Sequence, residues 1–167
     1  MSIYFSSDFH LGHNVIVPKY RDFSSQQEHD TLILDQIAAL KKRDILYILG
    51  DFIFDSDKYD YYISELDKTQ CRIKLVLGNH DSRKLYSEPR FELQLPLFSY
   101  KGIWVSHCPI HPQELRGRFN IHGHLHGSEV MLNKTDIKDP NYYNVNLDNH
   151  NHKFVDFDLI KETLCNH

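Results

Sequence analysis

The sequence predicts an α/β fold in which two mixed β-sheets pack face to face as a sandwich flanked by helices. Three observations predict it. The 167 residues are 41% hydrophobic and 25% charged, which is typical of one soluble domain, here expected to span residues 1–167. The first half alternates short apolar runs with amphipathic segments, an order that implies parallel strands joined by crossover helices. The second half holds short apolar runs separated by turns, which is typical of hairpins.

Eight runs rich in β-branched and aromatic residues are expected to be buried strands. They cover residues 3–7, 45–49, 72–77, 97–100, 103–106, 120–122, 142–147 and 153–157. The dipeptides Lys101-Gly102 and Gly127-Ser128 predict turns in the second half. We expect residues 141–147 and 153–160 to complete the sheet without adding catalytic groups.

Two helices are expected in the first half. Ser25 and Glu28 have the spacing of a capping box, and apolar residues then recur at helical spacing up to the basic run 41–43. A second helix is expected over residues 58–66. Its apolar face would be formed by Tyr59, Tyr62, Ile63 and Leu66.

Composition excludes several classes of protein. No apolar stretch approaches the roughly 18–20 residues that span a bilayer, and the N-terminus lacks the features of a signal peptide. The net charge of −4 argues against electrostatic coating of duplex nucleic acid, although a nucleotide or short oligonucleotide stays open as a substrate. The three cysteines are odd in number and unpaired in spacing, which indicates a reducing compartment and predicts a cytoplasmic location.

Polar groups that can bind metal follow each apolar run of the first half. Asp8 and His10 follow the first run, Asp51 the second, and Asn79 and His80 the third. The carboxyl ends of parallel strands share one edge of a sheet, so these side chains are expected to meet there. The glycines at 50 and 78 fit tight turns beside a ligand.

The second half repeats this arrangement. His107 follows the run 103–106, and Gly123-His124-Leu125-His126 follows the run 120–122. Asp8 and His10 are two residues apart, as are His124 and His126, and in extended backbone this spacing places both side chains on one face. Nitrogen and oxygen donors at five strand ends predict a metal centre.

These five blocks resemble those of the calcineurin-like metallophosphoesterase superfamily. The resemblance covers residues 8 to 126, and the contexts Ser-Asp-Phe-His-Leu-Gly-His13 and His122-Gly-His-Leu-His-Gly127 are similar to its small single-domain members. It implies the calcineurin-like phosphoesterase fold and two divalent metal ions. It also implies that one ion is held by Asp8, His10 and His126, that the other is held by Asn79, His107 and His124, and that Asp51 bridges them.

The chemistry of the donors agrees with this resemblance. Among these groups a carboxylate is the one that readily binds two cations, and mixed imidazole and oxygen ligands suit Mn, Fe, Ni or Zn better than Ca. We expect Mn²⁺ and attack by a metal-bridging hydroxide on phosphorus, without a covalent enzyme intermediate. The resemblance implies that His80 contacts substrate and protonates the leaving oxygen. Asp81 is expected either to orient His80 or to cap a helix.

Four further groups are weaker candidates for contact with substrate or ligands. His13 and Asn14 follow the first ligand pair, with a plain loop role as the alternative. His122 is expected to support the neighbouring ligands. Arg116 and Arg118 could grip a phosphate, although surface charge is the better reading of both. Solvated surface is the expectation for four remaining histidines, namely His29, His150, His152 and His167.

The predicted function is therefore hydrolysis of a small phosphodiester, such as a cyclic nucleotide or a nucleotide or RNA end. A phosphomonoesterase is the alternative enzyme, and a non-catalytic metal-stabilised binding scaffold is the alternative outside catalysis. A scaffold usually lacks ligands or the acid histidine, and every block is present here. A membrane partner and strong binding of duplex nucleic acid are not expected, and the sequence leaves the oligomeric state open.

Overall fold

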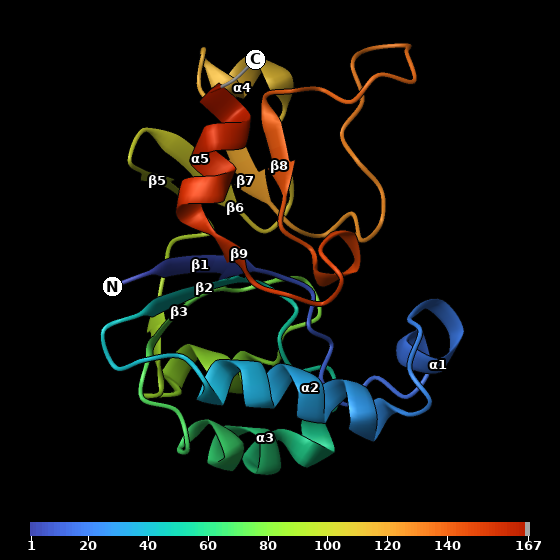
Figure 1. The fold of residues 1–167 in the computed structure, drawn as a ribbon, viewed down its shortest axis with the longest axis vertical. Helices are drawn as coiled ribbons and strands as arrows, with labels where there is room; N and C mark the ends of the chain where they lie inside the picture. Colours follow the sequence, from blue (N-terminus) through green and yellow to red (C-terminus); the bar gives the residue numbers. More distant parts are fainter. Residues whose placement is uncertain (166–167) are drawn as a thin grey trace.

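A computed structural model describes residues 1–165 and shows two stacked β-sheets (Figure 1). The first sheet has five strands in the order β4-β3-β2-β1-β9. Its strands are β1 (Ile3–Ser6), β2 (Ile45–Leu49), β3 (Arg72–Val76), β4 (Phe91–Leu93) and β9 (Val155–Asp156). Strands β1 to β4 pair in parallel, while β9 pairs antiparallel to β1. The expected α/β sandwich of mixed sheets is therefore confirmed.

The second sheet has four strands in the order β5-β6-β7-β8. They are β5 (Leu97–Tyr100), β6 (Ile103–Ser106), β7 (Asn120–His122) and β8 (Tyr142–Asn144). Lys101 and Gly102 form the expected tight turn between β5 and β6, with both residues at positive φ. The expected hairpin at Gly127-Ser128 is wrong, because β7 and β8 pair in parallel across a long loop.

Five α-helices complete the described chain, joined by short 3-10 turns. The helices are α1 (Ile16–Tyr20), α2 (Gln26–Ala38), α3 (Tyr59–Leu66), α4 (Pro112–Leu115) and α5 (Phe157–Cys165). The 3-10 turns cover Ser56–Lys58, Arg83–Ser87 and Leu147–Asn149. The Ser25 hydroxyl accepts from the amide of Glu28 at 3.1 Å, so the expected N-terminus of α2 is confirmed. None of these helices is long and apolar enough to cross a membrane.

The last segment of the chain corrects the sequence analysis. Residues 157–160 do not extend the sheet, because α5 begins at Phe157, where the Asp156 carboxylate accepts from the amide of Asp158. Phe157, Ile160 and Leu164 recur at helical spacing and are buried. The short strand β4 was also not expected.

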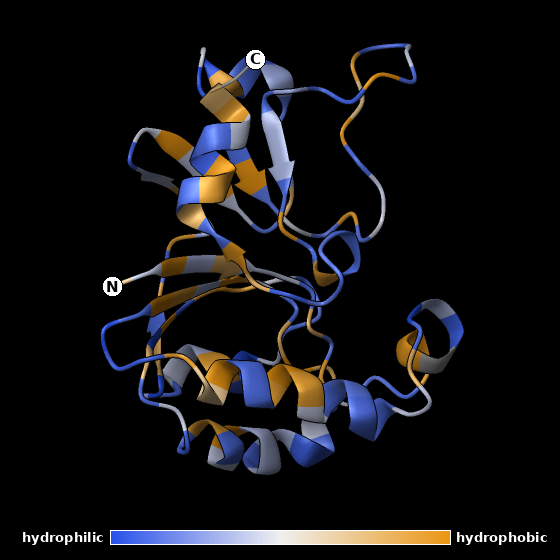
Figure 2. Cartoon of the chain, viewed as in Figure 1, coloured by the Kyte–Doolittle hydropathy of each residue, from blue (hydrophilic) through white to orange (hydrophobic). Residues whose placement is uncertain are grey.

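Each strand of the first sheet is buried on both faces, which explains its continuous apolar sequence. In β2, Leu46 and Ile48 pack toward α2 and α3, whereas Tyr47 and Leu49 pack toward the second sheet. The strands are accordingly among the most hydrophobic parts of the chain (Figure 2). This packing fixes the ends of β1, β2 and β3, where the polar groups of interest lie.

Candidate metal centre

The predicted ligands lie together at the carboxyl ends of the parallel strands, where loops from both sheets meet. Asp8 follows β1, Asp51 follows β2 and Asn79 follows β3, while His107 follows β6 and His124 follows β7. The loops are joined by backbone hydrogen bonds from His10 to the Asp51 carbonyl at 2.9 Å and from Gly123 to the His107 carbonyl at 2.8 Å.

The backbone at this edge has an unusual conformation. Five of the seven candidate ligands have positive φ: Asp8, His10, Asp51, His124 and His126. The expectation that each pair shares a face of extended backbone is therefore wrong. Non-glycine residues in this region cost free energy and gather at functional sites. Their concentration here indicates that the rest of the fold holds these side chains in place.

Glycines allow the loops to approach closely. Gly50 has a φ of +89°, and a Cβ at this position would collide with Nδ1 of His107. A Cβ at Gly78 would collide with the Asp51 carboxylate. Both glycines are thus required beside the candidate ligands, as the sequence indicated.

The first group of donors contains Asp8, His10 and His126, which can each offer an atom within 4.8 Å of the others. Asp8 and His10 are buried, and both Asp8 Oδ1 and His10 Nε2 lack a hydrogen-bond partner among the described residues. Burial lowers the pKa of His10 to about 2 and raises the pKa of Asp8. Buried polar atoms without partners are costly, and a bound cation would satisfy both.

The second group contains Asn79, His107 and His124. Asn79 Oδ1 lies 2.9 Å from His107 Nε2 and 3.1 Å from His124 Nδ1, and the two ring nitrogens are 3.3 Å apart. His107 Nδ1 lies 2.7 Å from the Leu49 carbonyl, so it carries the proton and leaves a lone pair on Nε2. Lone pairs of nitrogen and oxygen converge here, which fits a cation between them.

Asp51 lies between the two groups. Its Oδ2 atom is 3.7 Å from His10 Nε2 and 3.6 Å from His107 Nε2. Its Oδ1 atom accepts from the backbone amide of His80 at 2.9 Å, which fixes the carboxylate and the loop after β3 together. Asp51 also belongs with Asp8 and His107 to a third set of donors within 4.8 Å of one another.

Asp81 has a different role from either that the sequence suggested. Its carboxylate accepts from the backbone amides of Asp51, Phe52 and Gly78 at 2.8–2.9 Å. It therefore ties the loops after β2 and β3 to each other and neither orients His80 nor caps a helix. Burial raises its pKa, although the three amides act in the opposite direction.

The other weaker candidates lie in different surroundings. His13 lies at the rim, 5.8 Å from the His10 ring between centroids. His122 is buried, and its Nδ1 is 2.8 Å from the Gly123 carbonyl, so it contacts the strand end instead of a ligand imidazole. Arg116 is exposed and pairs with Glu114, while Arg118 lies over the Trp104 ring. Arg116 is therefore not part of the ligand cluster.

The expectation of solvated surface fails for His29, which is fully buried. His150 and His152 are half-buried, the former 2.8 Å from the Asn144 carbonyl and the latter against Phe23. His167 lies outside the described residues. His29 contacts Arg21 at 2.8 Å and Asp30 at 3.0 Å, so it belongs to a network below the metal centre.

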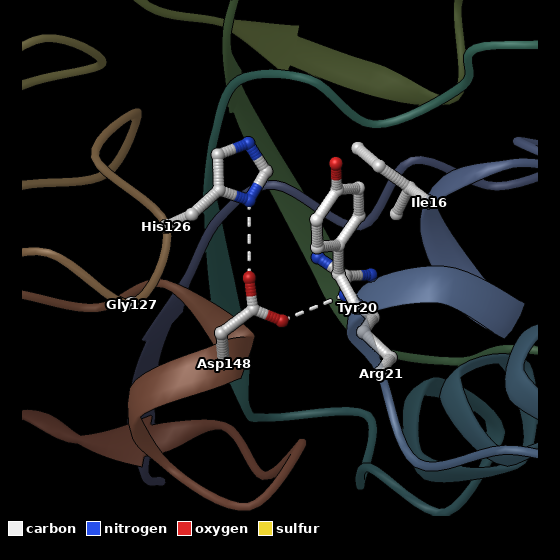
Figure 3. A pocket seen from close by; sticks show the side chains of 6 residues that line it. All are labelled: Ile16, Tyr20, Arg21, His126, Gly127 and Asp148. Atoms are coloured by element: carbon white, nitrogen blue, oxygen red, sulfur yellow. Dashed lines mark hydrogen bonds and ion pairs between the residues drawn. The ribbon is translucent and has the colours of Figure 1, made fainter.

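Arg21 and Asp148 are the functional residues that the sequence analysis missed. Asp148 accepts from His126 Nδ1 at 3.0 Å and from Arg21 Nε at 2.7 Å, as Figure 3 shows. Arg21 also donates to the backbone carbonyls of Asp8 at 2.7 Å and Phe9 at 3.1 Å. One arginine thus contacts the backbone of the first ligand loop and, through Asp148, the last ligand imidazole.

This arrangement sets the tautomer of His126. The carboxylate holds a proton on Nδ1, which leaves the Nε2 lone pair free for a metal. Burial alone would raise the pKa of Asp148, but the hydrogen bond from His126 and the charge of Arg21 outweigh burial and lower it. The hydrogen bond to Asp148 raises the pKa of His126.

Cys108 is a further donor that was not expected. Its thiol lies within 4.8 Å of ligand atoms of His107 and His124, at an exposed position. Burial of the sulfur raises the pKa of this thiol, and the charges of Asp51 and Asp8 act in the same direction. The neutral thiol therefore borders the second donor group.

Comparisons with known proteins agree with this geometry. An uncharacterized protein of Methanocaldococcus jannaschii is 30% identical over 165 residues, which cover 95% of this chain and 88% of that protein. The crystal structure of a protein of unknown function from Aquifex aeolicus superposes with a TM-score of 0.72 at 26% identity, over 96% of this chain and 98% of that one.

A third relative is one of the two kinds of polypeptide in the nuclease SbcCD of Escherichia coli. It is 31% identical over 98 residues, which are 54% of this chain but 24% of that polypeptide. The profile of the calcineurin-like phosphoesterase family matches residues 1–166, nearly the whole chain. With its clustered metal donors, the chain therefore belongs to the calcineurin-like phosphoesterases, a family of metal-dependent phosphoester hydrolases.

Proposed function

We propose that the protein is a phosphodiesterase that uses two divalent metal ions. Asp8, His10 and His126 would hold one ion and Asn79, His107 and His124 the other, with Asp51 shared between them. The observation that carries this proposal is the position of Asp51 Oδ2, which is nearly equidistant from His10 Nε2 at 3.7 Å and His107 Nε2 at 3.6 Å. One carboxylate oxygen between two donor groups fits a bridging ligand.

The donor chemistry supports Mn²⁺ as the metal, with Fe, Ni or Zn as alternatives. The seven groups are imidazole nitrogens, carboxylate oxygens and one amide oxygen, a mixture that suits first-row transition metals. Bound ions would supply Lewis acidity and an ionised water as the nucleophile. The protein would contribute the placement of these ions and the protonation of the leaving group.

His80 is the group that we propose for this protonation. Its side chain is exposed, and its ring lies 5.5 Å from the His10 ring between centroids. Its backbone amide is fixed by Asp51, so the imidazole stands beside the ligand set and can approach substrate. General acid catalysis of this kind contributes about 10²–10⁴-fold to the rate.

Two observations favour diesters over monoesters. Arg21 directs its guanidinium to Asp148, His29 and two carbonyls, and Arg116 pairs with Glu114, so neither arginine is available for a second phosphate charge. The relative from Escherichia coli is part of a nuclease, and nucleases cleave phosphodiesters. The net charge of −4 disfavours long duplexes, so small diesters or nucleic-acid ends are the proposed substrates.

Hydrolysis of bis-p-nitrophenyl phosphate with and without Mn²⁺ tests the proposal. We expect metal-dependent turnover that Asp51→Asn abolishes and that Asp136→Asn retains, since Asp136 makes the same charge change at an exposed loop position. Faster hydrolysis of p-nitrophenyl phosphate than of the diester would indicate a monoesterase. Absence of turnover on both esters, with Mn²⁺ bound, would indicate a scaffold.

A further inference from the structure

An aromatic pair stands beside His80 at the rim of the metal centre. The rings of Phe54 and His13 are stacked, with centroids 3.7 Å apart and planes at 26°. The Phe54 ring also lies 5.7 Å from the His80 ring and 6.2 Å from the His10 ring. Phe54 therefore joins the rim to both the proposed acid and a proposed metal ligand.

The pair is held by the backbone. The Phe54 amide donates to the Leu11 carbonyl at 3.0 Å, and the His13 amide donates to the His10 carbonyl at 3.0 Å. His13 Nδ1 accepts from the amides of Val15 and Ile16 at 3.3 Å, which leaves a proton on Nε2 and a neutral ring. The stacked surface is thus uncharged and anchored to the ligand loops.

The exposure of Phe54 is the feature that calls for a ligand. Its two neighbours on the same loop, Phe52 and Ile53, are 0% and 2% exposed, whereas Phe54 is 41% exposed. The loop therefore packs its other apolar side chains inside and presents this ring at the mouth of the site. An open aromatic face invites a second flat ring, since stacking tolerates any base.

We propose that Phe54, backed by His13, is a stacking platform for the base of a nucleoside leaving group. This inference rests on the proposed function, because it takes His80 as the neighbour of the leaving oxygen. A group carried on that oxygen extends over the ring next to His80, which is Phe54. The enzyme would then prefer phosphodiesters that release a nucleoside over those that release an alkyl alcohol.

A second aromatic side chain near the centre supplies the control. Tyr20 is 70% exposed and lines a cavity of about 550 Å³ with Ile16, Gly127 and the His126–Asp148–Arg21 chain (Figure 3). This cavity borders His126 and not His80, and a carboxylate belongs to its lining. If the base binds there, Tyr20 and not Phe54 will set the preference.

The test compares a dinucleoside monophosphate with the methyl ester of the same nucleotide, measured as nucleoside monophosphate released with Mn²⁺. We expect Phe54→Leu to lower the kcat/KM ratio of the first substrate to the second by about 5- to 100-fold, the loss given by one stacking contact. Phe54→Trp should keep the ratio, and Tyr20→Leu should leave it unchanged. Equal losses on both esters in Phe54→Leu, or a lower ratio in Tyr20→Leu alone, would overturn the proposal.

Calorimetric binding separates this inference from the proposed function. Wild-type protein that turns over neither ester would count against the proposed function, but the platform can still be measured with nucleoside 5′-monophosphate and ribose 5-phosphate as ligands. We expect Phe54→Leu to weaken binding of the nucleotide selectively. The same affinity ratio in wild type and Phe54→Leu would refute the platform.

Discussion

The chain from Arg21 through Asp148 to His126 makes the replacement Asp148→Asn informative. The carboxylate now accepts from Arg21 Nε and from His126 Nδ1. An asparagine offers one oxygen and one NH₂ group, and Arg21 cannot accept a hydrogen bond. The amide oxygen will therefore face Arg21, and the NH₂ group will face His126.

This orientation forces His126 into the other tautomer. Its Nδ1 must accept, so the proton moves to Nε2, the atom that is proposed to bind metal. Loss of such an outer partner typically costs 10–100-fold in metal affinity. The cost in stability is smaller, because Arg21 exchanges a charged acceptor for a neutral one, a difference of about 1 kcal/mol. For a chain of this length that is a fall in Tm of about 2–4 °C.

Calorimetric titration with Mn²⁺ and thermal melts of metal-free protein measure the two effects. Asp136→Asn, in an exposed loop, serves as the control for charge. The stabilising effect of Asp148 is present above its ordinary pKa of 3.8 and is lost as the pH falls through its lowered folded-state pKa, so the variant should lose this part of the acid dependence. Unchanged Mn²⁺ affinity in Asp148→Asn would refute the tautomer argument.

Three further predictions address individual side chains. His80→Ala should lower kcat by about 10²–10⁴-fold and leave Mn²⁺ affinity unchanged, and metal loss in this variant would contradict its role as the acid. Burial raises the pKa of Asp8, so in metal-free protein its contribution to stability falls as the pH rises above 3.8; Asp8→Asn should raise the Tm of metal-free protein at pH 7 and remove the gain on adding Mn²⁺. Alkylation of Cys108 in a Cys165→Ser background should reduce the bound Mn²⁺ from about two ions to one by calorimetry, whereas unaltered stoichiometry would place the second ion away from His107 and His124.

Local patterns in the sequence carried most of the fold. The apolar runs that became β2, β5, β6 and β7 were predicted with their observed bounds, because a strand buried on both faces has a continuous apolar sequence. The helix at the C-terminus was missed although Phe157, Ile160 and Leu164 have helical spacing, since residues 153–160 were assigned to the sheet as one unit.

The candidate ligands could be predicted because each follows a strand that ends at the same edge. Their backbone conformation could not, since left-handed φ at Asp8 or His126 depends on contacts between loops. Arg21 and Asp148 lie 127 residues apart in the sequence, and no local pattern links them. His29 looked like a surface residue of α2 because the buried arginine that it contacts was not known.

The number and position of bound metal ions test the central claim most directly. Crystals grown with Mn²⁺ and measured at the manganese absorption edge would show each ion by its anomalous signal. We predict two peaks, one among Asp8, His10 and His126 and one among Asn79, His107 and His124, with Asp51 between them. A single peak, or peaks that Asp51 does not join, would contradict the dinuclear centre.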